Sequence, residues 1–409
     1  MIETKEKLVP SLRFPEFNSE WKRNTIAKTF SIFNGYAFSS SDSIKENGVK
    51  WVKIADVGVD NMKEDNLSYL PKKFIDSYKK FVLKEGDYVL ALTRPILDDR
   101  LKIARINDFF HNSLLNQRVG KIVTSHNQDF VFNLLKRRKL VKEIENNIAG
   151  SDPPNLSSKE IRNIKVYLPE DKEQQKIASF LSAVDEKINQ LQRKKELLQA
   201  YKKGMMQQLF SQQLRFKNED GNDFPEWEEK KLGEVGEIVN GLTYSPNDID
   251  DNGVIVLRSS NVKKRRIDLE DQVRVSVEKY NPVKTGDILI CVRNGSKRLI
   301  GKNALIRNKD ENLAFGAFMS VFRSGYNEYI FHLFGSDIYK KQVYQNLGAT
   351  INSINGSDLK KFKIPFPSKE EQTKIASFLS ALDAKIDTVS TAIIQTQDFK
   401  KGLLQQMFV

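Results

Sequence analysis

The chain has 409 residues, of which 39% are apolar and 29% charged, and its formal net charge is +13. This length predicts two or three domains, and the apolar content excludes a disordered chain. The single cysteine, Cys291, excludes an internal disulfide and a cysteine-rich zinc site. Because the sequence has no secretory signal at its start and no apolar run long enough to span a bilayer, we expect a cytoplasmic protein with no membrane contact. A basic chain of this kind favours a polyanionic partner, most often nucleic acid.

Residues 1–167 predict a first mixed α/β domain. An apolar run ends in the turn residues Asn34-Gly35, and a later Gly86-Asp87 turn precedes a strand rich in β-formers. An amphipathic helix is expected at about 129–148, and another at about 326–347 in the second half of the chain. The basic run Lys136–Lys139 inside the first of these helices is expected to form a solvated face. A short strand follows and ends at Leu168-Pro169, where a helix should begin.

Residues 168–213 predict a central helix with a narrow apolar seam. Its apolar positions recur at alternating steps of four and three residues, which is typical of a coiled coil. The predicted seam positions are Ile177, Leu181, Val184, Ile188, Leu191 and Leu198. A single long helix with one narrow seam needs a partner helix.

The second half of the chain repeats the first. The segment EQTKIASFLSALDAKI at 371–386 answers EQQKIASFLSAVDEKI at 173–188, an offset of 198 residues. Residues 214–366 therefore predict a second mixed domain, and residues 367–409 a second seam helix. Its seam positions are Ile375, Leu379, Leu382, Ile386, Val389 and Ile393. Polar interruptions of the two seams are predicted at Lys195, Lys202 and Lys400.

This order predicts an α+β protein with a pseudo-two-fold internal repeat, in which two long antiparallel helices separate two domains. The helices agree almost residue for residue, whereas the domains share only framework positions such as Asn34-Gly35 and Asn240-Gly241. We infer that the helices perform the same task twice and that the domains act on different targets.

Two short motifs invite catalytic interpretations that their residues do not support. Asp152-Pro153-Pro154-Asn155 resembles the loop of amino-methyltransferases, but Asn155 replaces the aromatic residue that stacks on a flipped base. The segment 295–303 resembles a phosphate-binding loop, but it has five residues between its glycines and Asn303 in place of Ser or Thr. We expect no catalytic, cofactor-binding or metal-binding residues in this chain.

The doubled Glu-Gln…Lys-Ile-Ala helix start at 173–178 and 371–376, each preceded by a proline-ended strand and a variable domain, resembles the DNA-specificity subunit of type I restriction–modification enzymes. The resemblance covers essentially the whole chain. It implies that each domain recognises one half of a bipartite, asymmetric site in double-stranded DNA, and that the helices set the spacer between the halves. It also implies as partners two methyltransferase subunits and restriction–translocase subunits, to which S-adenosylmethionine, ATP and Mg²⁺ would belong.

Side chains that could contact DNA lie in turns after the predicted strands. Arginine favours guanine, and asparagine or glutamine favours adenine, whereas phosphates take any cation. The first-domain candidates are Asn34, Tyr36, Lys53, Thr93, Arg94, Arg100 and Lys102. The second-domain candidates are Arg258, Ser259, Asn261, Arg293, Asn294, Lys297, Arg298, Thr350 and Asn352.

Two other classes of function stay open at this stage. One is a self-contained DNA methyltransferase, which would modify DNA without partners. The other is a coiled-coil scaffold with no DNA role, against which the two unlike basic domains argue.

Overall fold

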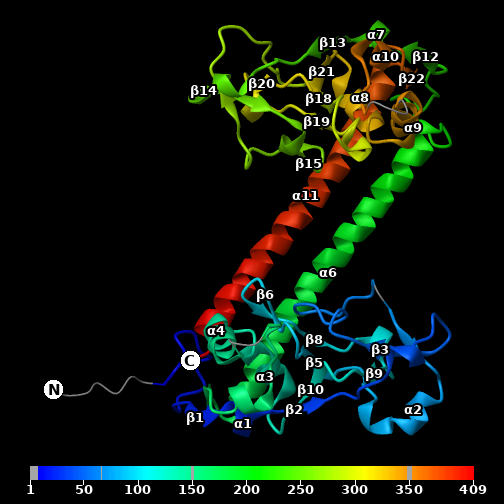
Figure 1. Ribbon diagram of the computed structural model, residues 1–409. Coiled ribbons are helices and arrows are strands. Elements are labelled where there is room, and N and C mark those ends of the chain that lie inside the picture. The colour runs from blue at the N-terminus through cyan, green and yellow to red at the C-terminus, as the bar shows by residue number, and fades with distance from the viewer. Residues whose placement is uncertain (1–7, 66, 149–151, 348–351) are drawn as a thin grey trace. The chain divides into compact units, whose positions relative to one another are not determined.

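The computed structural model describes residues 8–65, 67–148, 152–347 and 352–409 (Figure 1). The chain forms two compact units. Unit 1 comprises residues 1–192 and 391–409, and unit 2 comprises residues 193–390. Each unit therefore contains one domain, the start of the helix that follows it, and the end of the other long helix.

Unit 1 alternates short strands with short helices before its long helix. Its strands are β1 (Lys22–Thr25), β2 (Ser31–Asn34), β3 (Val49–Val52), β4 (Tyr69–Leu70), β5 (Tyr88–Ala91), β6 (Ile96–Leu97), β7 (Arg100–Leu101), β8 (Ile103–Arg105), β9 (Leu114–Leu115), β10 (Val119–Val123) and β11 (Lys165–Leu168). Its helices are α1 (Ile26–Thr29), α2 (Phe74–Ser77), α3 (Gln128–Leu134), α4 (Arg138–Ile148), α5 (Ser158–Ile161) and the first part of α6 (Asp171–Phe210).

Unit 2 has a similar, though not identical, order of strands and helices. Its strands are β12 (Glu228–Lys231), β13 (Glu237–Asn240), β14 (Ile249–Leu257), β15 (Val262–Lys263), β16 (Arg266–Ile267), β17 (Arg274–Val275), β18 (Ile288–Cys291), β19 (Asn303–Leu305), β20 (Ala314–Phe315), β21 (Met319–Arg323) and β22 (Lys363–Phe366). Its helices are α7 (Leu232–Val235), α8 (Asn327–Leu333), α9 (Asp337–Asn346), α10 (Gly356–Lys360) and the first part of α11 (Lys369–Gln406).

An antiparallel four-stranded sheet forms the centre of each domain. The strand order is β2-β10-β5-β8 in unit 1 and β13-β21-β18-β19 in unit 2. The short strand before each long helix pairs with the first strand of its domain, β11 with β1 and β22 with β12. A parallel pair, β3 with β9 and β14 with β20, adds a second small sheet.

The turn at Gly286-Asp287, which repeats the predicted Gly86-Asp87 turn and precedes β18, is held by the Asp287 side chain. Asp287 accepts a hydrogen bond from the Lys284 backbone at 2.8 Å and forms an ion pair with Arg323 on the neighbouring strand at 2.7 Å. In unit 1, Asp87 bonds the Lys84 backbone and the Lys121 ammonium in the same way. The turn and the sheet are thereby joined at one carboxylate.

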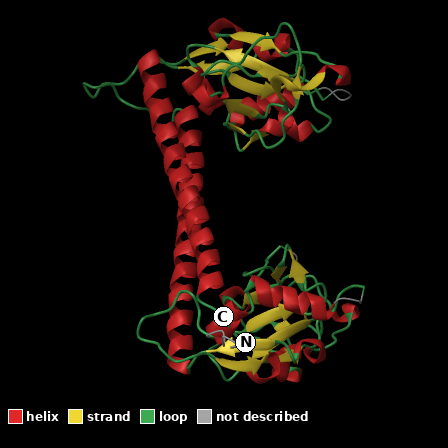
Figure 2. Ribbon diagram, turned by 90° about the vertical axis from the view of Figure 1, so that its left-hand side faces the viewer, coloured by secondary structure: helices red, strands yellow, loops and turns green. Residues whose placement is uncertain are grey.

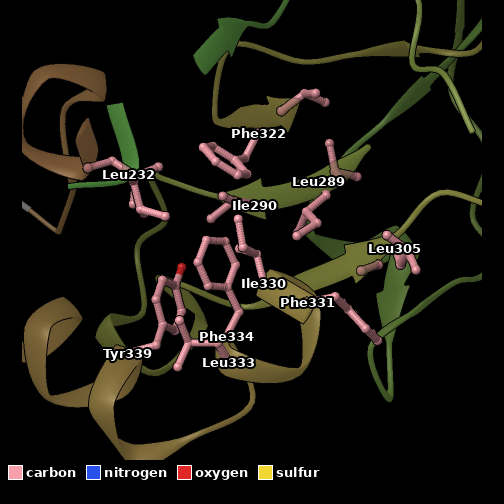
Figure 3. Packing of buried hydrophobic residues seen from close by; sticks show 14 of the residues in the cluster. Leu232, Leu289, Ile290, Leu305, Phe322, Ile330, Phe331, Leu333, Phe334 and Tyr339 are labelled. Atoms are coloured by element: carbon pink, nitrogen blue, oxygen red, sulfur yellow. The ribbon is translucent and has the colours of Figure 1, made fainter. Parts of the chain in front are cut away.

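The core of unit 2 lies between the central sheet and the helices α8 and α9. Figure 3 shows Ile330 of α8, with Phe334 just after it, packed among Ile290 of β18 and Phe322 of β21. These side chains belong to one buried cluster that continues into the first turns of α11, including Ile375 and Leu379. The long helix is therefore part of its own domain's core, which anchors it there.

Within each unit the two long helices lie side by side (Figures 1 and 2). Lys400 near the end of α11 forms an ion pair with Asp185 of α6 in unit 1. Lys202 near the end of α6 forms the repeat-equivalent pair with Asp383 of α11 in unit 2. Both lysines were predicted as polar interruptions of the seam, and the structure gives each of them a carboxylate partner.

The predicted seam positions serve two different surfaces. Leu191, Leu198 and Ile386 are half-buried, and the other seam residues are buried. The earliest ones, Ile177 and Leu181 in unit 1, belong to the domain's hydrophobic cluster. The coiled-coil spacing thus extends into the first turns of the long helix, where the seam residues pack in the core of the domain.

A buried carboxylate joins the start of each domain to the start of its long helix. Glu173 accepts two hydrogen bonds from the Arg13 guanidinium at 2.7 Å and one from the Trp21 indole at 3.3 Å. Glu371 accepts the same set from Arg215 and Trp227. Hydrogen bonding to Glu173 raises the pKa of Arg13. The Glu-Gln helix start and the Arg…Trp segment therefore form one contact, made twice.

Two local predictions are corrected by the structure. The helices expected at about 129–148 and 326–347 are each interrupted, as α3 with α4 and as α8 with α9. Lys136, which the sequence suggested was solvated, lies at the first corner with its side chain 9% exposed and its ammonium 2.7 Å from Asp60. The corner turns the helix back onto the sheet and carries this lysine inward.

The buried His332 predicts that the stability of unit 2 depends on pH. The side chain is buried in α8, and burial lowers its pKa to about 3. The unfolded chain has an ordinary histidine pKa of about 6.5, so between these values it binds the proton that the native state excludes. Stability should therefore fall as the pH drops below about 6.5, by about 2 kcal/mol between pH 7 and pH 5.

The repeat supplies a variant for this test, because Asn133 of α3 occupies the equivalent place in unit 1. His332→Asn should remove most of the pH dependence of unit 2. Hydrogen exchange of α8 at pH 5 and pH 7, in wild type and variant, measures it. Equal pH dependence in both proteins would contradict the assignment to His332.

Candidate nucleic-acid interface

The first-domain candidates gather at one end of the central sheet. Asn34 and Ala91 lie where β2 and β5 finish, opposite Gly120 and Val119 at the start of β10. On the far side of β5, Leu90 lies opposite Ile103 at the start of β8. Because the strands are antiparallel, the turns that carry the candidates all leave the sheet at this end. They contain Asn34, Tyr36, Thr93, Arg94, Arg100 and Lys102.

The polar groups of this end are partly committed to holding the loops. Thr93 bonds the side chain of Asn155 at 3.1 Å, and the Arg94 backbone bonds Pro154 O at 2.8 Å. The Lys102 ammonium donates to Ile54 O at 2.8 Å, and burial lowers its pKa. Arg94 itself is exposed. The Asp-Pro-Pro-Asn segment thus braces the loop that presents Arg94.

Arg100 and Tyr36 at this sheet end, and Lys53 away from it, differ in their exposure and contacts. Arg100 is exposed and lies 3.9 Å from Asp60. Lys53 is half-buried, with its ammonium 5.3 Å from the centre of the Trp51 ring. Tyr36 is 40% exposed, and its ring packs on Tyr78 at 4.6 Å between centroids. DNA contacts of these residues stay predictions.

The Asn-Gly turns have a packing reason. A Cβ on Gly35 would lie 2.2 Å from Asn116 O, and one on Gly241 would lie 2.2 Å from Gly316 O. Only glycine allows this approach of two backbones. The turn shared by the two domains therefore positions the loop that precedes β10 or β21.

The second-domain candidates lie at the equivalent end of the sheet in unit 2. Arg293 and Asn294 follow β18, and the Asn294 side chain donates to Ser259 Oγ at 3.0 Å. Lys302 donates to Ser259 O at 3.1 Å, as Lys102 does to Ile54 O. The Asn352 side chain donates to Gly295 O at 2.9 Å. Ser259, Asn294 and Asn352 are thus brought together beside the exposed Arg293.

One candidate is corrected. Asn261 has no exposed surface, and its amide donates to Asp268 O and Asp271 O while its oxygen accepts from the Arg258 backbone. All of these bonds shape the loop, so Asn261 offers no group to DNA. The prediction missed this because a buried asparagine that stabilises a turn has the same local sequence as an exposed one.

The remaining second-domain candidates are placed as follows. The Arg258 guanidinium lies 2.8 Å from Asp271, so its charge is paired within the domain. Lys297 and Arg298 are exposed, and Arg298 lines a cavity of about 860 Å³ together with the end of α6 and with α9. Thr350 lies outside the described residues.

The structure adds exposed residues that the sequence analysis did not select. Gln117 and Arg118 lie between β9 and β10, at the same sheet end as Arg94. Ala317 and Phe318 take the equivalent place in unit 2, where Phe318 is 56% exposed. No sequence pattern marked them, because β9 and β20 contain only two residues each and their pairing is not local.

The residues that the structure describes contain no cluster of three or more His, Cys, Asp or Glu side chains able to hold a metal ion. Burial raises the pKa of the Cys291 thiol to about 11. Across the described ranges, no helix is both long enough and apolar enough to cross a membrane.

The structure defines a class of protein in which two copies of one α+β framework present different polar and basic side chains, each at the equivalent end of its own central sheet. The chain belongs to the family described as the type I restriction modification DNA specificity domain, whose model matches residues 18–199 and again 225–396. The fold class predicted from the sequence is confirmed.

Similar proteins carry related names. The type I restriction enzyme MjaVIII specificity subunit of Methanocaldococcus jannaschii is 33% identical over 50% of this chain and 48% of its own length. The type I restriction enzyme EcoBI specificity subunit of Escherichia coli is 22% identical over 96% of this chain and 86% of its own length. The matched region thus spans about half the length of the MjaVIII relative.

Solved structures show the same fold at low sequence identity. The S subunit of a type I restriction–modification system from M. genitalium matches with a TM-score of 0.60 at 15% identity, over 98% of this chain and 99% of that one. A chain from a study of complex assembly in a type I R-M system matches with a TM-score of 0.56 at 17% identity, over 95% and 97%.

Proposed function

We propose that this chain is the DNA-specificity subunit of a type I restriction–modification complex and recognises a bipartite, asymmetric site in double-stranded DNA. The observation that carries the proposal is the contrast between the two sheet ends. Their framework is the same, with Lys102 and Lys302 bonding equivalent carbonyl groups. Their side chains differ, because one domain exposes Arg94 and the other exposes Arg293 beside the half-buried Asn294. Two domains with the same framework and different exposed side chains suit two different half-sites.

The proposal assigns no catalysis to this chain. Methylation and cleavage would belong to two methyltransferase subunits and to restriction–translocase subunits, which would also bind S-adenosylmethionine, ATP and Mg²⁺. The long helices suit the docking of such subunits, and the complex would act on DNA in the cytoplasm. The family and the missing chemistry of the motifs at 152–155 and 295–303 support this division.

A domain exchange tests the proposal. Residues 1–167 are replaced by the first domain of another family member, and the chimera is produced with its methyltransferase partners. We expect methylome sequencing to show one half-site changed and the other retained. Methylation of DNA by the purified chain alone, or alteration of both half-sites, would overturn the proposal.

A further inference from the structure

The loops before β10 and β21 have a fixed backbone. We call residues 116–118 and 316–318 the tip loops. In unit 1, Gln117 N donates to Tyr36 O, and Arg118 O accepts from Leu92 N, each at 2.9 Å. In unit 2, Phe318 O accepts from Val292 N at 3.0 Å and from Arg293 N at 3.1 Å. Each tip loop is thus bonded to the segment after β5 or β18 that carries candidate residues.

The Asn116 side chain belongs to this network, because its oxygen accepts a hydrogen bond from the Arg118 backbone at 3.0 Å, whereas the Arg118 and Phe318 side chains lie outside it. Arg118 is exposed, and among the described residues it forms no ion pair, in contrast to Arg258 with Asp271. Phe318 is 56% exposed, and the centre of its ring lies 5.8 Å from Arg293 Cζ. Groups held on a rigid backbone with uncommitted side chains suit recognition, because little freedom is lost on binding.

The chemistry of Arg118 and Phe318 indicates which part of DNA the tip loops contact. An arginine binds phosphates as well as bases, whereas a phenylalanine has no group that binds a phosphate. Phenylalanine makes apolar contact with the thymine 5-methyl group in the major groove. The two tip loops are equivalent, so the assignment of Phe318 to a base edge assigns Arg118 to base edges as well. At a base edge, arginine binds guanine through two hydrogen bonds.

Resting on the proposed function, we propose that Arg118 and Phe318 are specificity-determining residues. Arg118 recognises a guanine in the half-site of the first domain. Phe318 contacts a thymine 5-methyl group in the half-site of the second domain.

The first test compares methylation by the complex of this chain with its methyltransferase partners. Arg118→Ala should relax one position of one half-site, with preference for guanine there falling about tenfold or more. Its control is Arg105→Ala, an exposed arginine where β8 finishes, at the opposite end of the same sheet. Phe318→Ala should relax one position of the other half-site. Its control is Tyr344→Ala on α9, which is 64% exposed.

The second test addresses the methyl group itself. Deoxyuridine lacks the 5-methyl group of thymidine and is placed singly at each thymine of the second half-site. We expect one position at which this change weakens binding by the wild-type complex about fourfold, the loss in affinity expected when one buried methyl group is removed. At that position the Phe318→Ala complex should not respond.

The outcomes separate the inference from the function on which it rests. A wild-type complex without sequence preference would overturn the proposed function. A specific wild-type complex whose preferences persist in both variants overturns the role of the tip loops. Weakening by Arg118→Ala that is even across all sequences assigns Arg118 to a phosphate and likewise overturns the inference.

Discussion

Replacing Glu173 by alanine is expected to destabilise unit 1 by about 3–5 kcal/mol, the usual cost of leaving one partner of a buried ion pair uncompensated. The Glu173 side chain is 1% exposed and the Arg13 side chain 13% exposed. Without the carboxylate, the guanidinium stays in a poorly hydrated place and the Trp21 indole loses its acceptor. The start of the domain should then separate from the helix.

Urea unfolding followed by hydrogen exchange of each unit would measure the effect. Glu371→Ala should produce the equivalent loss in unit 2, because Arg215 and Trp227 bond it in the same way. Glu186→Ala, an exposed position on α6, is the matched control and should change stability little. A loss no larger than that of the control would show that this contact does not hold the domain to its helix.

The sequence predicted best those parts of the fold whose sequence pattern occurs in both halves of the chain. The seam of Leu181 and Leu379, the Asn-Gly turns and the Gly-Asp turns each occur in both halves. A local pattern that recurs in a divergent copy has been kept for a shared structural reason. The packing of Gly35 and Gly241 against a carbonyl shows what that reason is.

Side-chain partners were less predictable, because equivalent sites are filled from different chain positions. In unit 1 the Lys136 ammonium lies 4.2 Å from the Phe132 ring centre and pairs with Asp60. In unit 2 the Arg265 guanidinium lies 3.9 Å from the Phe331 ring centre, and a Cβ on Gly335 would meet it. The cation comes from the helix corner in one domain and from the β15–β16 turn in the other. No local pattern encodes such an exchange.

The candidate interface was predictable in its location more than in its members. Turns after strands were expected to carry the contacts, and antiparallel pairing brings Thr93, Arg94 and Arg100 to one sheet end. Asn261 was misjudged because its bonds run to backbone groups seven and ten residues away. Arg118 was overlooked because its place depends on the pairing of β9 with β3, which are more than 60 residues apart.

Inserting one heptad into each long helix should lengthen the spacer between the half-sites by about three base pairs. The insertions follow Gln192 and Ser390, repeat-equivalent positions at which α6 and α11 pass from one unit into the other. Seven residues add about 10 Å of helix and keep the seam in phase. DNA rises about 3.4 Å per base pair, so the recognised halves should stay the same while the distance between them grows.

The design depends on changing both helices. The pairs Asp185–Lys400 and Lys202–Asp383 fix the pairing of α6 with α11 inside each unit, and a heptad in α6 alone leaves α11 too short to keep both. That single insertion should therefore impair assembly, as should two residues added to each helix, which turn the seam away from its partner. Methylation mapping distinguishes these cases. An active double-heptad variant with an unchanged spacer would show that the helices do not set the distance, because their length is the only quantity that the variant alters.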